Sequence, residues 1–311
     1  MDEFALLWNH VRFSIRQGFW MKKKEIVHDL TLSVPRGTVM GLVGPNGAGK
    51  TTTIKLGAGL LRPESGQVLI CGNQAQDAQS RKKLALLTET QYIYPHLKLR
   101  EWLTMLAGFS GLGSQKISQR IDEVLTLFEL RDRSEQMMHT LSKGQLQRAG
   151  LAQTFVHEPD ILLLDEPMSG LDPYWRYRVQ KIFQDCKAQG KTILFSSHIL
   201  LDVERLSDRI ALLENGNLRW EGNISDLPRK IKGYEAVCHT DDPGIIEKLS
   251  VQKAVHQPGG EWILSLSLSQ KDALLETVRT QLLKLESLHP VQEEFEEVLF
   301  HFTANAREKK E

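Results

Sequence analysis

The chain has few cysteines and no pattern that would pair them. Its 311 residues contain three, Cys71, Cys186 and Cys238, and these lie far apart in the sequence. An odd number of widely spaced cysteines excludes a disulfide framework and is typical of reduced thiols in a cytosolic protein. No two of them have the spacing of metal ligands, which excludes a metal site built on paired cysteines.

The chain also lacks net charge and long apolar runs. Lys and Arg together number 39, as do Asp and Glu, so no global basic field recruits nucleic acid or an anionic bilayer. No stretch approaches the roughly 20 apolar residues of a membrane-spanning helix. Residues 1–8 are too short and too acidic for a signal peptide. We therefore expect a cytoplasmic protein with no nucleic-acid partner.

Hydrophobic periodicity indicates the organisation of the first two thirds of the chain. Residues 9–34 alternate between apolar and polar positions, which predicts antiparallel strands. From there to about residue 228, apolar runs alternate with helical patterns, as in an α/β fold whose parallel strands are joined by helices. Within this part, residues from about 96 to 150 carry helical spacing. They predict a helical subdomain inserted into the α/β core.

The tail from residue 230 onward has its own pattern. Residues 262–269 alternate cleanly, and apolar residues then return at helical spacing. Residues 291–302 combine early acidic residues with an apolar stripe and predict a closing helix. We therefore expect a core domain over residues 1–229 and a small α+β domain over residues 230–311.

A glycine-rich run follows the strand-like residues 39–43. It fits the pattern G-x-x-x-x-G-K-[ST] and consists of Gly44, Pro45, Asn46, Gly47, Ala48, Gly49, Lys50, Thr51 and Thr52. Phosphates need many donors at close range, and glycines let backbone N–H groups approach without obstruction. A helix that begins near Lys50 points its positive end at the phosphates. Lys50 then reaches the β and γ groups, and the Thr51 hydroxyl is placed to ligate Mg²⁺.

Four more short motifs follow in order. They are LSKGQ at residues 141–145, ILLLDE at 161–166, SGLD at 169–172 and SSH at 196–198. Five parts in register do not arise by chance. With them, the chain resembles the ATP-binding subunits of ABC transporters over roughly residues 22–228. In that family the four later motifs are the signature loop, the Walker B strand, the D-loop and the switch histidine.

Two carboxylates follow the apolar strand of the Walker B motif. Asp165 would be costly there unless it lies at the ligand-binding edge of a sheet, where it would hold Mg²⁺ through water. Glu166 is the candidate general base for the attacking water, or the residue that positions it. The resemblance implies that His198 bonds to the γ-phosphate and that Asp172 lies at a dimer boundary. An intact Glu166 argues for ATP hydrolysis.

The residues before the helical stretch 146–155 form a second anion site. The hydroxyl and backbone N–H groups of Ser142, Gly144 and Gln145 combine there with the positive end of a helix. Lys143 stands where the family most often has glycine, and it adds a cation. In the family this loop closes over the ATP of a partner subunit. The resemblance therefore implies a head-to-tail dimer, of identical or closely related subunits, with two ATP at its interface.

Two assignments stay open. Where the family has a glutamine that ligates Mg²⁺, this chain has Glu89, whose carboxylate is also an oxygen donor suited to a hard cation. Gln91 takes this role if the loop is shifted by two residues. Adenine normally stacks on an aromatic side chain ahead of the phosphate loop. Phe19 or Trp20 can supply it, and either can equally be a core residue.

The resemblance implies an ATPase subunit that drives a separate transmembrane permease, with ATP and Mg²⁺ as cofactors, from the inner face of the cell membrane. Residues 290–299 resemble the closing helix of exporter ATPases of the drug, sodium and multidrug-resistance type. Glu89 with Tyr94 and Pro95 points the same way, so we expect export. An importer subunit is an alternative, and so is a translation or repair ATPase. Those factors usually carry a second ATPase half or a long coiled coil, and this chain has neither.

Overall fold

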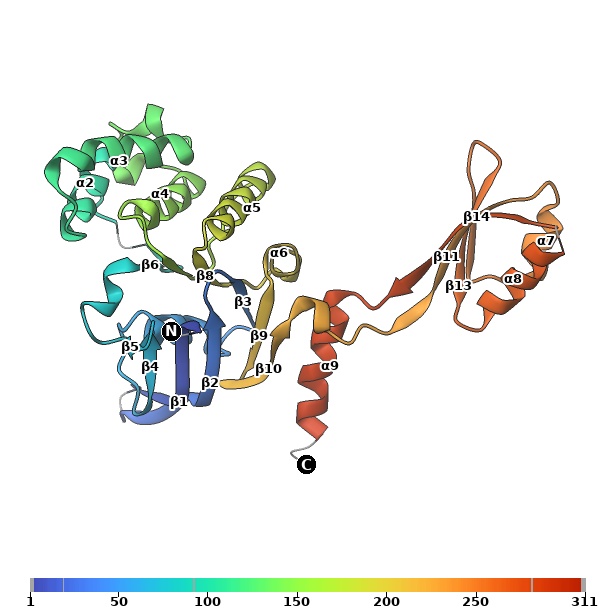
Figure 1. Ribbon diagram of the computed structural model, residues 1–311, viewed down its shortest axis with the longest axis horizontal. Helices are drawn as coiled ribbons and strands as arrows, with labels where there is room; N and C mark the ends of the chain where they lie inside the picture. The colour runs from blue at the N-terminus through green and yellow to red at the C-terminus, as the bar shows by residue number, and fades with distance from the viewer. Residues whose placement is uncertain (1–2, 19, 92, 281, 309–311) are drawn as a thin grey trace. The chain divides into compact units, whose positions relative to one another are not determined.

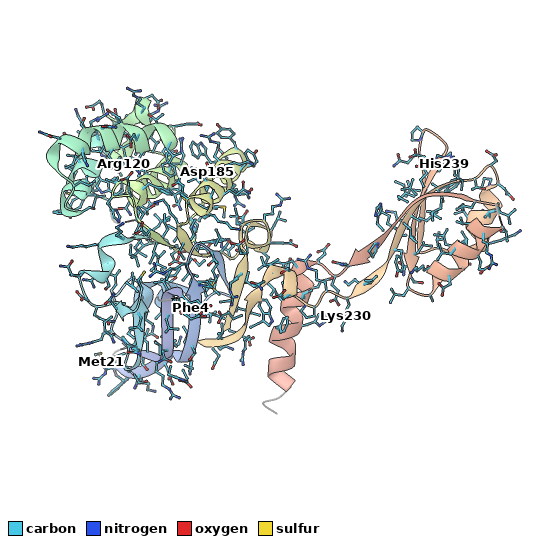
Figure 2. The ribbon with its side chains drawn as sticks, in the orientation of Figure 1. Phe4, Met21, Arg120, Asp185, Lys230 and His239 are labelled. Atoms are coloured by element: carbon cyan, nitrogen blue, oxygen red, sulfur yellow. The ribbon has the colours of Figure 1, made fainter. Side chains whose placement is uncertain are left out.

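The computed structural model describes residues 3–308 except 19, 92 and 281, and it contains two compact units (Figure 1). The first unit includes the chain up to Asp226, and the second runs from Leu227 to Asn305. Figure 2 draws the side chains, with Phe4 labelled in the first unit and His239 in the second. The boundary between the units falls after Asp226, three residues before the predicted boundary after residue 229.

The first unit begins with a four-stranded antiparallel sheet in the order β2-β1-β4-β5. Alternate residues of its second strand, such as Leu30, Leu32 and Val34, are buried, which confirms the antiparallel strands expected from the alternating pattern. The strands are β1 (Phe4–Gln17), β2 (Lys22–Pro35), β4 (Ser65–Ile70) and β5 (Asn73–Gln74).

A six-stranded sheet in the order β10-β9-β3-β8-β7-β6 forms the centre of this unit. All its neighbouring pairs are parallel except β9 and β10. Every residue of β3, β7 and β8 is buried, as in strands that are covered on both faces. The strands are β3 (Val39–Val43), β6 (Leu84–Leu87), β7 (Ile161–Leu164), β8 (Thr192–Ser196), β9 (Arg209–Glu214) and β10 (Asn217–Asn223).

Helices complete the first unit and confirm the predicted α/β class. Three of them, α2 (Leu99–Phe109), α3 (Ser114–Leu127) and α4 (Lys143–Phe155), gather into the inserted helical subdomain (Figure 1). The others are α1 (Lys50–Gly57), α5 (Pro173–Ala188) and α6 (Leu200–Leu206). One apolar cluster joins both sheets and α1. Within it, the Trp8 indole donates a hydrogen bond to the carbonyl of Thr53 (3.2 Å).

The second unit has the order strand, helix, strand, strand, helix, strand. Its antiparallel sheet runs β12-β13-β11-β14, which is the arrangement of a ferredoxin-like domain. Its core contains Ala236, Cys238, Leu264 and Leu274. The elements are β11 (Ile231–His239), α7 (Pro243–Lys248), β12 (Lys253–His256), β13 (Glu261–Ser267), α8 (Gln270–Arg279) and β14 (Lys284–Gln292). The predicted small α+β domain is confirmed.

The closing helix begins later than the sequence predicts. Val291 still pairs with Gly233, and Gln292 pairs with Ile231, so the chain remains in β14 at these positions. The helix α9 spans Phe295–Glu308, with Glu296 and Glu297 in its first turn. These acidic residues favour a helix start there because they face the positive end of the helix dipole. Among the residues placed in Figure 1, no helix is both long and apolar enough to cross a membrane.

Candidate functional site

Four neighbouring strands deliver the motif residues to one edge of the six-stranded sheet. β3, β8, β7 and β6 are adjacent and parallel, and ligands bind where the carboxyl ends of such strands meet. A cavity of about 510 Å³ lies at this edge, within the usual size of a small-molecule site. Its lining consists of Lys24, Ile26, Asn46, Gly47, Ala48, Gly49, Lys50, Thr51, Thr52, Glu89, Asp165, Glu166, Ser169 and His198.

The phosphate loop depends on glycine at two positions. Gly44 has φ +154°, and a Cβ there would lie 2.2 Å from the carbonyl oxygen of Leu213. Gly49 has φ +102° and immediately precedes α1. Only glycine adopts such angles without strain and allows this close approach. The loop therefore leads directly into the N-terminus of α1, whose unpaired N–H groups and dipole favour an anion.

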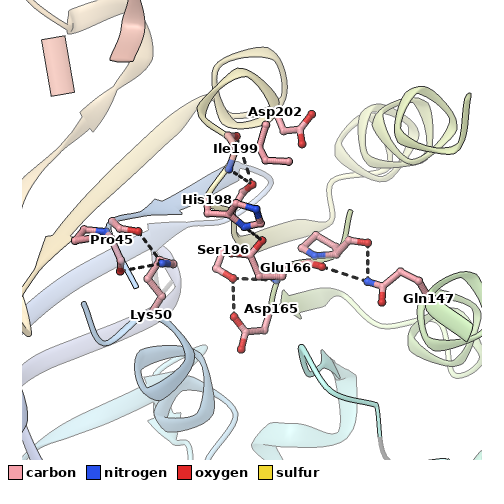
Figure 3. A network of polar contacts seen from close by, with 12 residues as sticks. Pro45, Lys50, Gln147, Asp165, Glu166, Ser196, His198, Ile199 and Asp202 are labelled. Carbon is pink, nitrogen blue, oxygen red and sulfur yellow. Dashed lines mark hydrogen bonds and ion pairs between the residues drawn. The ribbon is translucent and has the colours of Figure 1, made fainter. Parts of the chain in front are cut away.

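Lys50 places a buried cation inside the loop. Its Nζ donates to the carbonyl oxygens of Gly44 (2.7 Å) and Pro45 (3.2 Å) (Figure 3), and the residue is only 8% exposed. Burial lowers the pKa of the ammonium, and the carboxylates of Glu166, Asp165 and Glu89 oppose that shift. The cavity thus holds one buried positive charge facing several carboxylates.

Asp165 offers an oxygen that has no protein partner. It is 2% exposed, and its Oδ1 accepts a hydrogen bond from Ser196 Oγ (2.6 Å). Its Oδ2 is buried and unpartnered within the part of the chain that the structure describes. Buried polar atoms normally have a partner, and carboxylate and hydroxyl oxygens are the donors that Mg²⁺ prefers. With Thr51 and Glu89 lining the same cavity, the donor set fits Mg²⁺.

Glu166 is held from both sides in a strained turn. Its φ is +51°, in the left-handed region that is uncommon for a residue with a side chain. Its N–H donates to Ser196 Oγ (2.9 Å), and its Oε2 lies 2.8 Å from Nδ1 of His198 (Figure 3). Burial raises the pKa of the Glu166 carboxyl, while His198 and Lys50 act against the rise. A carboxylate with a raised pKa is a better proton acceptor than an exposed one.

The signature-loop residues lie outside this cavity. Ser142 begins α4 with a capping box, in which its Oγ accepts from Gln145 N (3.3 Å) and Gln145 Oε1 accepts from Ser142 N (2.8 Å). The methylene groups of Lys143 pack against Gly170 of the D-loop, and Gly144 also approaches Gly170. None of the four lines the cavity of its own chain.

Asp172 caps a helix in the single chain. Its Oδ1 accepts a hydrogen bond from the N–H of Trp175 (2.8 Å) at the start of α5, which is the usual role of Asp at an N-cap. The residue is exposed. Its expected place at a dimer boundary stays a prediction.

The two alternatives for the loop after β6 point to different places. Glu89 is exposed and lines the cavity with Lys50, Asp165 and Glu166. Gln91 instead turns toward α4, where its Nε2 donates to Gln147 Oε1 (2.9 Å). The structure therefore brings Glu89, and not Gln91, together with the phosphate loop.

Of the two expected adenine-stacking residues, the one that the structure describes does not line the cavity. Trp20 lies in the turn between β1 and β2, is 80% exposed and does not line the cavity. Phe19 lies outside the described residues. Lys24 and Ile26 of β2 line the cavity instead, and no motif distinguishes them because they belong to an ordinary strand.

Two further polar residues at the site have no sequence pattern that predicts their contacts. Ser196 forms hydrogen bonds with both Asp165 and Glu166. It is the first residue of the SSH motif, but the motif itself predicts no role for it. Gln147 lies on α4 and donates to the carbonyl oxygens of Glu166 and Pro167 (3.2 and 2.8 Å). Its place five residues after Ser142 was the only signal.

A phosphate loop, a pair of carboxylates and a histidine at the carboxyl edge of a parallel sheet define a P-loop ATPase. The family model for ABC transporter matches residues 27–169. An uncharacterised ABC transporter ATP-binding protein of Nostoc sp. is 39% identical over 261 residues, covering 83% of this chain and 78% of that protein. The chain belongs to the family of ABC transporter ATP-binding proteins, and it is an ATP-binding transporter subunit with ATPase activity.

Two other similarities agree with this assignment. The Nod factor export ATP-binding protein I of Cupriavidus pinatubonensis is 34% identical over 204 residues, which cover 65% of this chain and 63% of that protein. A solved structure of an ATP-binding subunit of an ABC transporter is 32% identical, with a TM-score of 0.65 over 72% of this chain and 91% of that one. The fold predicted from the motifs is thereby confirmed.

Proposed function

We propose that this ATPase works as a head-to-tail dimer that encloses two ATP and powers export through a separate permease. The observation that carries the proposal is the composition of the cavity. It gathers the phosphate loop, the carboxylates and His198, whereas residues 142–145 do not line it. Ser142 and Lys143 are exposed at the start of α4. A second copy, facing the first, supplies its signature loop to each nucleotide.

In this proposal the phosphate loop binds ATP through its backbone and through Lys50. The N–H groups of residues 46–52 and the positive end of α1 contact the phosphates. Lys50, already buried beside Gly44 and Pro45, reaches the β- and γ-phosphates. The partner copy adds the N–H groups at Lys143 and Gly144 and the Lys143 ammonium from the opposite side.

Thr51, Asp165 and Glu89 would hold Mg²⁺ beside the phosphates. Asp165 acts through water, and its unpartnered Oδ2 is the support for this role. When bound, Mg²⁺ neutralises charge that develops on the β- and γ-phosphate oxygens. Ser196 fixes the Asp165 carboxylate in place through its short hydrogen bond to Oδ1.

Hydrolysis uses the pair formed by Glu166 and His198. The Glu166 carboxylate accepts a proton as water attacks the γ-phosphorus, and ADP leaves. The half-buried position that raises its pKa makes the carboxylate a stronger proton acceptor. His198, which is bonded to Glu166 Oε2, orients the carboxylate and reaches the γ-phosphate from the exposed side of the cavity.

The names of the Nod factor export relatives support export. The permease would hold the protein at the cytoplasmic face of the membrane. Reconstitution of the chain and its permease in lipid vesicles tests the direction. An exporter hydrolyses ATP and moves cargo away from the ATPase side without any other protein. Hydrolysis that requires a binding protein on the opposite side would identify an importer instead, and an absence of any membrane partner would favour a non-transport ATPase.

Glu89 offers a prediction in the same reconstituted system. We expect Glu89→Ala to weaken permease-stimulated hydrolysis more than the basal rate of the isolated chain, because an oxygen donor to the ion is lost beside Lys50. Glu89→Gln should restore much of the rate, since an amide oxygen is also a donor. Steady-state phosphate release measures both. If Glu89→Ala changes neither rate, Glu89 is not a ligand of the ion.

A further inference from the structure

Gln147 has a buried side chain, and three hydrogen bonds hold its amide group in one orientation. It is 7% exposed, and its Nε2 donates to Pro167 O (2.8 Å) and Glu166 O (3.2 Å). Because only the amide nitrogen can donate to two carbonyl oxygens, the amide cannot be flipped. Its Oε1 must therefore face Gln91, which lies 2.9 Å away and donates through Nε2.

The Glu166 turn is thus fixed by two partners outside its own strand. Ser196 Oγ accepts from the N–H of Glu166, and Gln147 binds the carbonyl oxygens of Glu166 and the next residue (Figure 3). The turn needs such partners because Glu166 adopts a left-handed backbone conformation, which persists only where the surroundings enforce it. The N–H of Ser169 also donates to Glu166 O (3.1 Å). Loss of Gln147 therefore removes one of two donors to the Glu166 carbonyl and the Gln147 donor to the Pro167 carbonyl, which loosens the turn.

Gln91 reaches Gln147 only because α4 has a glycine, Gly150, at the point where Gln91 packs against it. A Cβ built on Gly150 would lie 2.2 Å from Gln91 Nε2 and 2.3 Å from its Cδ. Gly150 is buried within α4, one turn after Gln147. Gln91 lies on the segment that joins β6 to α2, so a shift of that segment acts directly on the Gln147 amide.

We propose that Gln147 is a positioning residue for Glu166, and that Gln91 acts on Glu166 through Gln147. The loop after β6 thereby reaches the carboxylate that activates water by a chain of side-chain hydrogen bonds, without contact with nucleotide or ion. This inference rests on the proposed role of Glu166 as general base. It gives Gln91 a function that differs from the one expected of Glu89.

The test measures ATP hydrolysis by the isolated full-length chain and by five variants that each carry one substitution. Gln147→Leu should lower kcat by about 10- to 100-fold, and Gln91→Leu by about 3- to 10-fold, with KM for ATP unchanged because residues 46–52 are untouched. Gly150→Ala should match Gln91→Leu, since it displaces Gln91 and leaves Gln147 bonded. Alanine also favours the helix more than glycine does. A merely structural role would lower the melting temperature and the fraction of active protein. Because a smaller active fraction also lowers the apparent kcat with KM unchanged, kcat is calculated per ATP-binding site counted by nucleotide titration, and a structural role leaves that value unchanged.

The double variant of Gln91→Leu and Gln147→Leu is the sharpest comparison. If Gln91 acts only through Gln147, the double variant has the kcat of Gln147→Leu alone. Gln153→Leu is the matched control, because Gln153 lies on the same helix and donates to Leu86 O (3.2 Å) rather than to the Glu166 turn; its kcat should equal that of the wild type.

Additive losses in the double variant, or wild-type kcat in Gln147→Leu, would overturn the inference. If Gln147→Leu does not fold, Gly150→Ala and Gln91→Leu provide the test. A wild-type kcat in both of these variants would also overturn the inference. Glu166→Gln, assayed beside them, separates the two proposals. A retained rate in Glu166→Gln removes the role of Glu166 itself, whereas a lost rate there with normal Gln147→Leu removes only the role of Gln147.

Discussion

Glu166→Gln is expected to lower steady-state ATP hydrolysis by about 100- to 1,000-fold, with ATP affinity within a few-fold of the wild type. The amide cannot accept the proton of the attacking water. In the proposal the residues that hold ATP are separate from Glu166, because residues 46–52 lie in the loop after β3 and in the first turn of α1. The Ser196 and Gln147 bonds to the backbone of residue 166 also survive the change. Phosphate release and equilibrium nucleotide titration measure the two quantities.

Glu158→Gln is the matched control for this substitution. Glu158 also has a positive φ of 52°, but it is exposed and pairs with Arg120 (3.6 Å) away from the cavity. Its rate should equal the wild-type rate. Hydrolysis by Glu166→Gln within a few-fold of wild type would remove Glu166 from the proposed mechanism.

Lys50→Ala should lose ATP binding rather than only the chemical step. We expect the affinity to fall by roughly 100-fold, the size of effect seen when one partner of a buried charge pair is removed. Lys50 is the cation buried among Glu166, Asp165 and Glu89, so without it the phosphates face these carboxylates uncompensated. Titration with a fluorescent ATP analogue measures the loss.

Lys55→Ala serves as the comparison for Lys50→Ala. Lys55 lies in the last turn of the same helix and does not line the cavity. Lys55→Ala should keep the wild-type affinity for ATP. That result would show that ATP binding depends on the position of Lys50 and not on any lysine of α1. Equal affinity of Lys50→Ala and the wild type would mean that this loop is not the nucleotide site.

Much of the fold and the main chemical groups could be predicted from the sequence because the motifs are local. The glycine pattern around Lys50 encodes a loop conformation, and a carboxylate after four apolar residues marks the end of a buried strand. Such signals fix Asp165, Glu166 and His198 at the edge of one parallel sheet. The alternating strands of the two antiparallel sheets were predictable for the same reason.

What could not be predicted depends on contacts between distant segments. Ser196 and Gln147 matter because β8 and α4 bring them to the backbone of Glu166, and neither has a sequence pattern of its own. The sequence predicts Gln91 as the alternative Mg²⁺ ligand, but the absence of a side chain at Gly150 leaves room for Gln91 against α4. The start of α9 was placed too early because β-pairing of Val291 and Gln292 overrides their helical pattern.

The mass of Glu166→Gln in solution with ATP and Mg²⁺ tests the central claim most directly. The proposal predicts a particle of twice the 35.4 kDa of one chain, with one ATP bound per chain, because the signature loop that each cavity lacks must come from another copy. Adding Gly144→Glu, which places a negative charge at that loop, should return the protein to a monomer that still binds ATP. A Glu166→Gln chain that stays monomeric while saturated with ATP would contradict the shared site.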